Sequence, residues 1–98
     1  MELHPDIVRF CTLLEELEGL LKNNNACFWA EKIGRCRRSA ENSDEWGVHC
    51  FLGLFGGMGS LNDLILHRNE MPLGQENDEL RALRERAWRA GKDLVTDK

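Results

Sequence analysis

The sequence predicts an all-α fold, a compact bundle of four main helices with a short fifth helix between the third and the fourth. Four segments repeat apolar residues at three- and four-residue steps, which is the period of an amphipathic helix. Two prolines and no tyrosine in 98 residues are not the composition of a sandwich or barrel of many short strands. A chain of this length forms one core, so we expect residues 1–98 to fold as a single domain.

The first two helices are predicted from their apolar spacing and from the residues at their ends. The first begins near Pro5, where a missing N–H costs nothing, and ends before Asn23-Asn24-Asn25, which tolerate turn conformations. Its apolar residues are Ile7, Phe10, Leu13, Leu14, Leu17, Leu20 and Leu21. The second helix covers about residues 26–40, and its apolar stripe consists of Trp29, Ile33, Cys36 and Ala40.

The third segment, about residues 44–55, differs from the others because apolar side chains cover nearly its whole circumference. Only Glu45 and His49 form a narrow polar strip, and a helix that is apolar on all sides must be enclosed by protein. We therefore expect this helix to be central and buried. Gly47 and Gly53 each cost a helix about 1 kcal/mol relative to alanine, and the close approach of a neighbouring helix would offset that cost.

A glycine turn, Gly56-Gly57-Met58-Gly59, follows the third helix and precedes a helix-start signal that begins at Ser60. The spacing of the next apolar residues predicts a short helix from Ser60; these residues are Leu61, Leu64 and Ile65. Residues 67–75 are predicted as a loop because they include a proline and a glycine. The last helix covers about residues 77–95. Its ion pairs at i,i+4 spacing predict a solvated, salt-bridged face, and these pairs are Arg81–Glu85, Glu85–Arg89 and Arg89–Asp93.

The glycine turn admits two interpretations. In the structural one, a glycine ends the third helix in a left-handed conformation, Met58 fills the core, and Ser60 with Asp63 caps the next helix. In the functional one, the turn lines a ligand cleft against Trp29 or Trp88, with Asp63 as a general base. The residues that would bind the ligand are Gly57, Met58, Ser60, Asn62 and Asp63. The turn holds no lysine or arginine and matches neither a Walker loop nor a dinucleotide fingerprint, which disfavours phosphate binding.

Residues 56–64, Gly-Gly-Met-Gly-Ser-Leu-Asn-Asp-Leu, together with the earlier Trp29-Ala30 pair, resemble a family of small uncharacterised bacterial proteins. Members of that family have a similar length and order of parts, often with phenylalanine at the position of Leu61. The resemblance spans most of the chain, although only the motif at residues 56–64 is specific. It implies a bacterial intracellular α-helical domain, and it implies no reaction.

The residue pattern indicates no catalytic centre, metal site or cofactor. The four cysteines contain no C-x-x-C pair and match no zinc framework, so we expect buried, reduced thiols at Cys11, Cys27, Cys36 and Cys50. The N-terminus has no signal-peptide pattern, and the longest apolar run is far short of the ~20 residues of a membrane span. We therefore expect a cytoplasmic protein without membrane contact.

Charge and composition favour a protein partner. The apolar fraction of 42% and the charged fraction of 31% are those of a folded domain, and a net charge of -4 disfavours nucleic-acid binding. The acidic cluster Glu15, Glu16 and Glu18 is the candidate contact surface for a basic partner. The leading hypothesis is thus a protein-binding module, either an adaptor or a toxin-neutralising immunity protein. Two alternatives stay open, a small-ligand or enzymatic site on residues 56–63 and a homodimeric structural domain.

Overall fold

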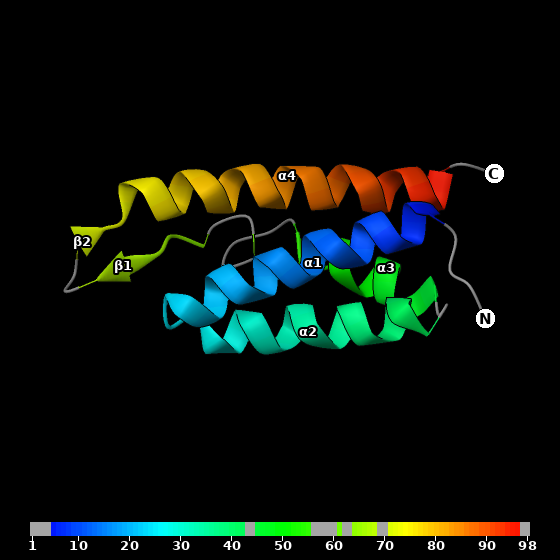
Figure 1. Cartoon of the computed structure of the whole chain (residues 1–98), viewed down its shortest axis with the longest axis horizontal. Coiled ribbons are helices and arrows are strands. Elements are labelled where there is room, and N and C mark those ends of the chain that lie inside the picture. Colours follow the sequence, from blue (N-terminus) through cyan, green and yellow to red (C-terminus); the bar gives the residue numbers. More distant parts are fainter. Residues whose placement is uncertain (1–4, 43–44, 56–60, 62–63, 69–70, 97–98) are drawn as a thin grey trace.

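The computed structural model of the chain confirms the all-α class and describes residues 5–42, 45–55, 61, 64–68 and 71–96. These described residues contain four helices and one short β-hairpin (Figure 1). The elements are α1 (Pro5–Asn23), α2 (Cys27–Glu41), α3 (Glu45–Leu52), β1 (His67–Arg68), β2 (Met71–Pro72) and α4 (Gly74–Thr96). The molecule is elongated, with principal extents of 45 × 25 × 19 Å.

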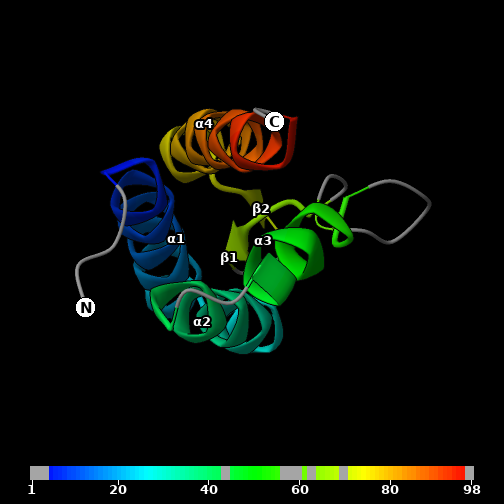
Figure 2. The ribbon, with the colours of Figure 1, turned by 90° about the vertical axis from the view of Figure 1, so that its right-hand side faces the viewer.

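The four helices occupy the corners of a bundle, as the end-on view in Figure 2 shows. Helix α1 packs against α2 and α4, and α3 packs against the same two helices from the other side. The hairpin lies at the end of the bundle where α4 begins (Figure 1). Each helix therefore has two neighbours, and the core fills the space between all four.

The turn between α1 and α2 forms as its asparagines predict. Asn25 adopts a left-handed conformation with φ 64°, which asparagine tolerates better than most residues. The Ala26 N–H donates to the Leu21 carbonyl at 2.9 Å, and the Asn25 N–H donates to the Lys22 carbonyl at 3.3 Å. These two bonds make a Schellman motif, with asparagine at the position that glycine usually occupies.

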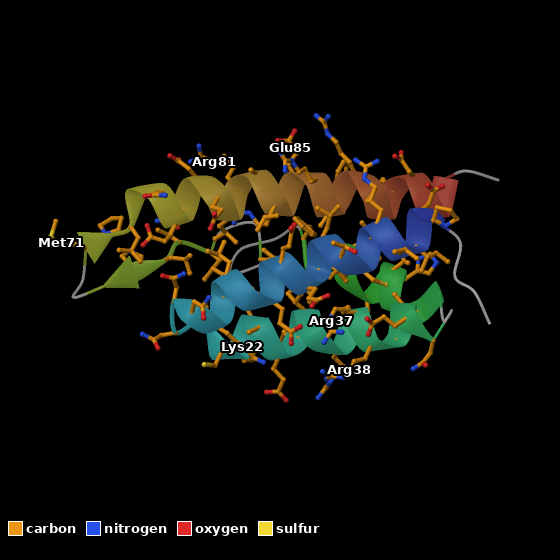
Figure 3. All side chains as sticks on the ribbon, in the orientation of Figure 1. Lys22, Arg37, Arg38, Met71, Arg81 and Glu85 are labelled. Atoms are coloured by element: carbon orange, nitrogen blue, oxygen red, sulfur yellow. The ribbon has the colours of Figure 1, made fainter. Side chains whose placement is uncertain are left out.

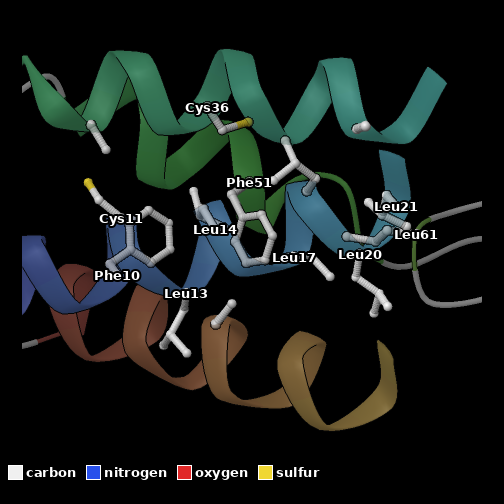
Figure 4. Packing of buried hydrophobic residues seen from close by; sticks show 14 of the residues in the cluster. Phe10, Cys11, Leu13, Leu14, Leu17, Leu20, Leu21, Cys36, Phe51 and Leu61 are labelled. Atoms are coloured by element: carbon white, nitrogen blue, oxygen red, sulfur yellow. The ribbon is translucent and has the colours of Figure 1, made fainter. Parts of the chain in front are cut away.

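The centre of the core is built mainly from α1. Phe10, Leu14 and Leu17 are fully buried, and the Phe10 ring meets the edge of Phe51 from α3 at 5.6 Å between centroids (Figure 4). This edge-to-face geometry is the favourable one for two aromatic rings. The other large side chains with full burial come from α1, α2, α4 and the segment after the glycine turn: Leu21, Ile33, Cys36, Leu61 and Leu80.

The expectation that the third helix is central and enclosed is not confirmed. Helix α3 is eight residues long and lies at one corner of the bundle (Figure 2). It buries Val48 and Phe51, whereas Trp46 is 51% exposed and His49 is also exposed. Apolar residues are common on protein surfaces, so an apolar circumference does not by itself require burial on every side.

The two glycines of this segment have different roles. A Cβ on Gly47 would lie 2.5 Å from the Cys36 carbonyl oxygen and 2.6 Å from the Ala40 backbone nitrogen, so α3 approaches α2 as closely as expected. Gly53 is exposed and follows the last residue of α3, and a Cβ there would meet only the carbonyls of His49 and Cys50. The predicted helix–helix contact at Gly53 is therefore wrong.

The chain after the glycine turn also differs from the prediction. Leu61 lies in a 3-10 conformation, but Leu64 and Ile65 lie outside any helix, so the expected short helix does not extend to them. Residues predicted as a loop pair instead as an antiparallel hairpin, with His67 opposite Pro72. The Leu73 N–H extends this pairing by donating to the Leu66 carbonyl at 3.0 Å. Helix α4 then begins at Gly74, three residues before the predicted start.

Candidate functional site

The candidate ligand-binding residues on the glycine turn lie outside the described residues; these are Gly57, Met58, Ser60, Asn62 and Asp63. The described residues on either side show how the turn is closed. The Leu61 N–H donates to the Leu54 carbonyl at 2.9 Å, and the Leu61 side chain is fully buried. The two ends of the turn are thus held together at the edge of the core.

Arg84 on α4 anchors the chain that leaves this turn. Its Nη1 donates to the Leu61 carbonyl at 2.8 Å and to the Leu64 carbonyl at 3.3 Å. Hydrogen bonds from a charged donor are stronger than those between neutral groups. The Leu61 carbonyl also accepts a hydrogen bond from the Leu64 N–H at 3.3 Å, so this half-buried guanidinium adds charged donors to the backbone bonding of the segment. The solvated face predicted for the last helix therefore does not extend to Arg84, which is half-buried.

Asn77, in the first turn of α4, fixes the start of the hairpin. The Leu66 N–H donates to Asn77 Oδ1 at 2.7 Å, and Asn77 Nδ2 donates to the Leu66 carbonyl at 3.0 Å. A side-chain amide offers both a donor and an acceptor, so it can pair with a backbone amide at two points. Arg84 and Asn77 together place α4 along residues 61–66.

A cleft opens beside Arg84, between α4 and the segment that follows α3. We call it the α4 cleft; it has a volume of about 330 Å³ and is lined by Phe55, Arg81, Arg84, Glu85 and Trp88. Of the two tryptophans considered for a ligand cleft, the structure places Trp88 here. Trp29 is instead half-buried against the core, with its ring meeting the edge of Phe28 at 5.5 Å between centroids.

The three acidic residues proposed as a contact surface on α1 do not share one environment. Glu15 and Glu16 are exposed. Glu18 is 9% exposed, and its Oε1 accepts a hydrogen bond from Arg37 Nε at 3.0 Å. Arg37 lies between α1 and α2 and also contacts Glu41 at 2.8 Å (Figure 3). Glu18 is therefore part of the α1–α2 interface, and the exposed acidic surface of α1 consists of the other two.

Hydrogen bonding in this interface stabilises the positive charge of Arg37. Partial burial lowers the pKa of its guanidinium, but the hydrogen bond to Glu18 and the negative charges of Glu18 and Glu41 outweigh that effect. The pKa of Arg37 consequently lies above its ordinary value. A network of this kind holds two helices in register.

Glu16 lines a second concave surface, which we call the α1–α4 groove. It has a volume of about 480 Å³, and its walls come from the second half of α1 and the first half of α4. Its lining residues are Glu16, Gly19, Leu20, Asn23, Glu79, Ala82, Leu83 and Arg86. A Cβ added to Gly19 would meet nothing within 4 Å, so the absence of a side chain there leaves part of the groove open.

The cysteines are free thiols, and two of them are deeply buried. Burial raises the pKa of Cys11 and of Cys36, and a hydrogen bond with Cys50 raises that of Cys36 further. A thiol with a raised pKa is a poor nucleophile near neutral pH. Cys27, in contrast, is exposed at the start of α2, which departs from the expected burial.

Neither a metal centre nor a membrane span emerges within the described ranges. Their histidines, cysteines and carboxylates do not gather into any group of three that could hold a metal ion. No helix among the same residues combines the length and the apolar character needed to cross a bilayer.

Comparison with known protein families shows which family the chain belongs to. Residues 22–73 match the family described as Domain of unknown function (DUF6966). The chain belongs to this family. Neither a search of curated proteins nor a search of solved structures found a match. The DUF6966 match agrees with the expectation of a domain family without an assigned activity.

The DUF6966 match covers the last residues of α1, all of α2 and α3, the glycine turn and the hairpin. Phe55 of the α4 cleft lies within this part of the chain, whereas Arg84 and Trp88 lie beyond it. The α1–α4 groove lies almost entirely outside it, since Asn23 alone among its lining residues is matched.

Proposed function

We propose that this DUF6966 chain is a protein-binding module that receives a basic segment of a partner in the α1–α4 groove. The observation that carries the proposal is the position of Glu16, an acidic residue singled out from the sequence, on the wall of a concave surface. Glu79 on α4 supplies a second carboxylate to the same groove. An amphipathic helix or extended segment is the kind of ligand that such grooves between helices bind.

The groove offers both apolar contact and charge. Leu20 is 8% exposed and Leu83 is half-buried, so an apolar side chain of the partner would find an apolar surface there. Among the described residues, Glu16 and Glu79 make no ion pair or hydrogen bond with another side chain. Their charges therefore remain free to attract a cation. Within the described part of the chain, Arg86 is the one cation that lines the groove, which leaves an acidic balance in keeping with the net charge of -4.

The partner is accordingly expected to carry lysine or arginine beside an apolar anchor residue. Attraction between unlike charges raises the association rate and favours the correct partner more than it raises affinity. The adaptor and immunity-type roles share this surface and differ in what the partner does. In the immunity-type role the bound protein is toxic, and co-expression of the chain restores growth.

The test compares purification of partners by the wild-type chain with purification by two charge-matched variants. Glu16→Lys with Glu79→Lys reverses the groove, whereas Glu31→Lys with Asp93→Lys makes the same change in net charge at exposed positions on α2 and α4. We expect a basic protein that binds the wild type and the control, and that binds the groove variant at least about tenfold more weakly. Its affinity for the wild type should also fall as salt is raised. Equal binding to both variants, or no protein retained by the wild type, would overturn the proposal.

A further inference from the structure

Two thiols meet where α3 packs against α2. Cys36 lies on α2 and Cys50 lies on α3, and a hydrogen bond joins the two side chains. Both cysteines are free thiols. A hydrogen bond between thiols places the two sulfur atoms in contact, whereas a disulfide bond holds them about 2.05 Å apart. A covalent bond between these two sulfur atoms therefore depends on how closely the backbones of the two helices approach.

The backbones of α2 and α3 approach each other closely beside this pair. Gly47 precedes Cys50 by three residues, so the two share one face of α3. A Cβ on Gly47 would lie 2.5 Å from the Cys36 carbonyl oxygen, so α3 comes nearest to the main chain of α2 at the residue that carries the other thiol. A disulfide needs its two Cα atoms within about 4.4–6.8 Å, and larger side chains at a helix contact hold the backbones further apart. Gly47 thus provides the close approach that a bridge between α2 and α3 requires.

The two thiols differ in their access to solvent. Cys50 is half-buried, whereas Cys36 is fully buried. A reagent in solution therefore meets Cys50 first, and Cys36 is reached more readily through Cys50 than from solvent. Burial raises the pKa of Cys36 most strongly, the hydrogen bond with Cys50 raises it further, and the positive charge of Lys32 lowers it by less. Cys36 is thus protected from solvent but lies beside the thiol that solvent reaches.

The other two cysteines are placed differently. Cys11 is buried on α1 and lies apart from Cys36 in the core (Figure 4). Cys27 is exposed at the start of α2, and Cys36 lies about 13 Å further along the same helix. A disulfide cannot span that distance while the helix stays intact. Cys50 is therefore the thiol that the fold brings against Cys36.

We propose that Cys36 and Cys50 are an oxidisable pair, which a small disulfide such as glutathione disulfide closes into a bond between α2 and α3. The bond joins the two helices covalently across their contact at Gly47. The inference goes beyond the proposed partner contact and does not depend on it, because neither cysteine lines the α1–α4 groove.

The bond forms by two successive thiol–disulfide exchanges. The Cys50 thiol loses its proton to solvent and its sulfur attacks glutathione disulfide, whose sulfur–sulfur bond breaks so that one glutathione thiolate leaves and takes up a proton. The Cys36 thiol then loses its proton and attacks the Cys50 sulfur, which forms the protein disulfide and releases the second glutathione. The two cysteines lose two electrons, and glutathione disulfide gains them. Contact between the two sulfur atoms makes the second exchange intramolecular, which offsets the low nucleophilicity that a raised pKa gives Cys36.

The experiment equilibrates the reduced full chain with glutathione disulfide, in native buffer and in concentrated urea. Acid stops the exchange, and mass spectrometry of peptic peptides identifies each linked pair of cysteines. In native buffer we expect at least about tenfold more Cys36–Cys50 bond than Cys27–Cys36 bond, and excess reduced glutathione should reverse it. In urea the shorter loop closes more readily, so the Cys27–Cys36 bond should become the more abundant of the two. The proposal fails if the native chain forms no Cys36–Cys50 bond, or if its linked pairs are distributed as they are in urea.

Two alanine variants test the order of the exchanges. Cys36→Ala removes the second thiol, so we expect the adduct between Cys50 and glutathione to reach at least about tenfold its wild-type level. Cys27→Ala removes an exposed thiol away from the pair and should leave formation of the Cys36–Cys50 bond unchanged. An adduct no more abundant in Cys36→Ala than in the wild type would overturn the proposal, as would loss of the bond in Cys27→Ala. Where Cys36→Ala does not fold, the pairing found in the native wild-type chain decides the outcome.

Discussion

Replacing Gly47 with alanine tests whether the contact between α2 and α3 is a contact of backbones. The new Cβ would lie 2.5 Å from the Cys36 carbonyl oxygen and 2.6 Å from the Ala40 nitrogen. An ordinary van der Waals distance begins near 3.4 Å, so α3 must move away by roughly 0.9 Å at this point. Both neighbours are main-chain atoms of α2, and neither can rotate aside.

The change in the free energy of unfolding caused by Gly47→Ala is the difference between an overpacking cost and a gain in helix propensity. Overpacking of a core contact costs about 1–3 kcal/mol, and two rigid main-chain neighbours place this contact in the upper part of that range, at about 2–3 kcal/mol. Alanine in place of glycine within a helix returns about 1 kcal/mol. We expect Gly47→Ala to lower the free energy of unfolding by about 1–2 kcal/mol, as measured by urea denaturation followed by far-UV circular dichroism.

Gly19→Ala is the matched control for this measurement. It makes the same substitution inside α1, where the Cβ would meet nothing within 4 Å. We expect it to raise the free energy of unfolding by about 0.5–1 kcal/mol. The reasoning is refuted if Gly47→Ala is as stable as the wild type or more stable while Gly19→Ala behaves as expected.

Three further predictions concern the buried charges and thiols. Arg37→Gln should cost about 2–3 kcal/mol in urea denaturation because it removes the closer cation from the buried Glu18 carboxylate and leaves only exposed Lys22 at 4.0 Å, whereas exposed Arg38→Gln should cost less than about 0.5 kcal/mol; equal losses would contradict the pairing. In native protein, a thiol reagent should modify Cys27 first, and mass spectrometry should find Cys11 and Cys36 unmodified until urea unfolds the chain. Stability should also fall above about pH 9, because the unfolded chain then loses thiol protons that the folded chain retains at its raised pKa values. Cys36→Ala should reduce this slope by up to about 1.4 kcal/mol per pH unit, and an unchanged slope would contradict the raised pKa of this thiol.

The boundaries of α1 could be predicted because their causes are local. Pro5 marks the start of α1, and Asn25 accepts the left-handed conformation at its end whatever surrounds it. The inward face of α1 is likewise predicted by the spacing of its apolar residues. Phe10 and Leu14 belong to this apolar set, and both are buried. Signals of this kind need no knowledge of what packs against the helix.

The position of α3 could not be predicted in the same way. Its apolar circumference says that several faces can be buried, but the neighbours decide which of them are. Those neighbours cover Val48 and Phe51 and leave Trp46 half exposed. The burial of Glu18, in contrast, could have been predicted from its position on the helix. It follows Cys11 by seven residues and Leu14 by four, so it lies on the apolar arc of α1.

The candidate sites depend on contacts between distant parts of the chain. Arg84 donates to the carbonyls of Leu64 and Leu61, which lie 20 and 23 positions earlier in the chain. Asn77 donates to the Leu66 carbonyl, 11 positions earlier. On a helical wheel an arginine that reaches a carbonyl of another segment is indistinguishable from one that faces water. The predicted ligand site on the glycine turn stays a prediction, and the α4 cleft adjoins that part of the sequence only through Phe55. The residues that line the cleft there became visible only from the packing of α4.

The extent of the family match bears on where function can reside. Residues 22–73 include the close contact at Gly47 but exclude the parts of α1 and α4 that bury Phe10, Leu17 and Leu80. The matched segment therefore cannot cover its own apolar face, and the flanking helices complete the core. The same flanking helices form the α1–α4 groove and supply every charged residue that lines the α4 cleft. A relative that shares only the matched segment would keep the α2–α3 scaffold, while its binding surfaces would be set by whatever helices close its core.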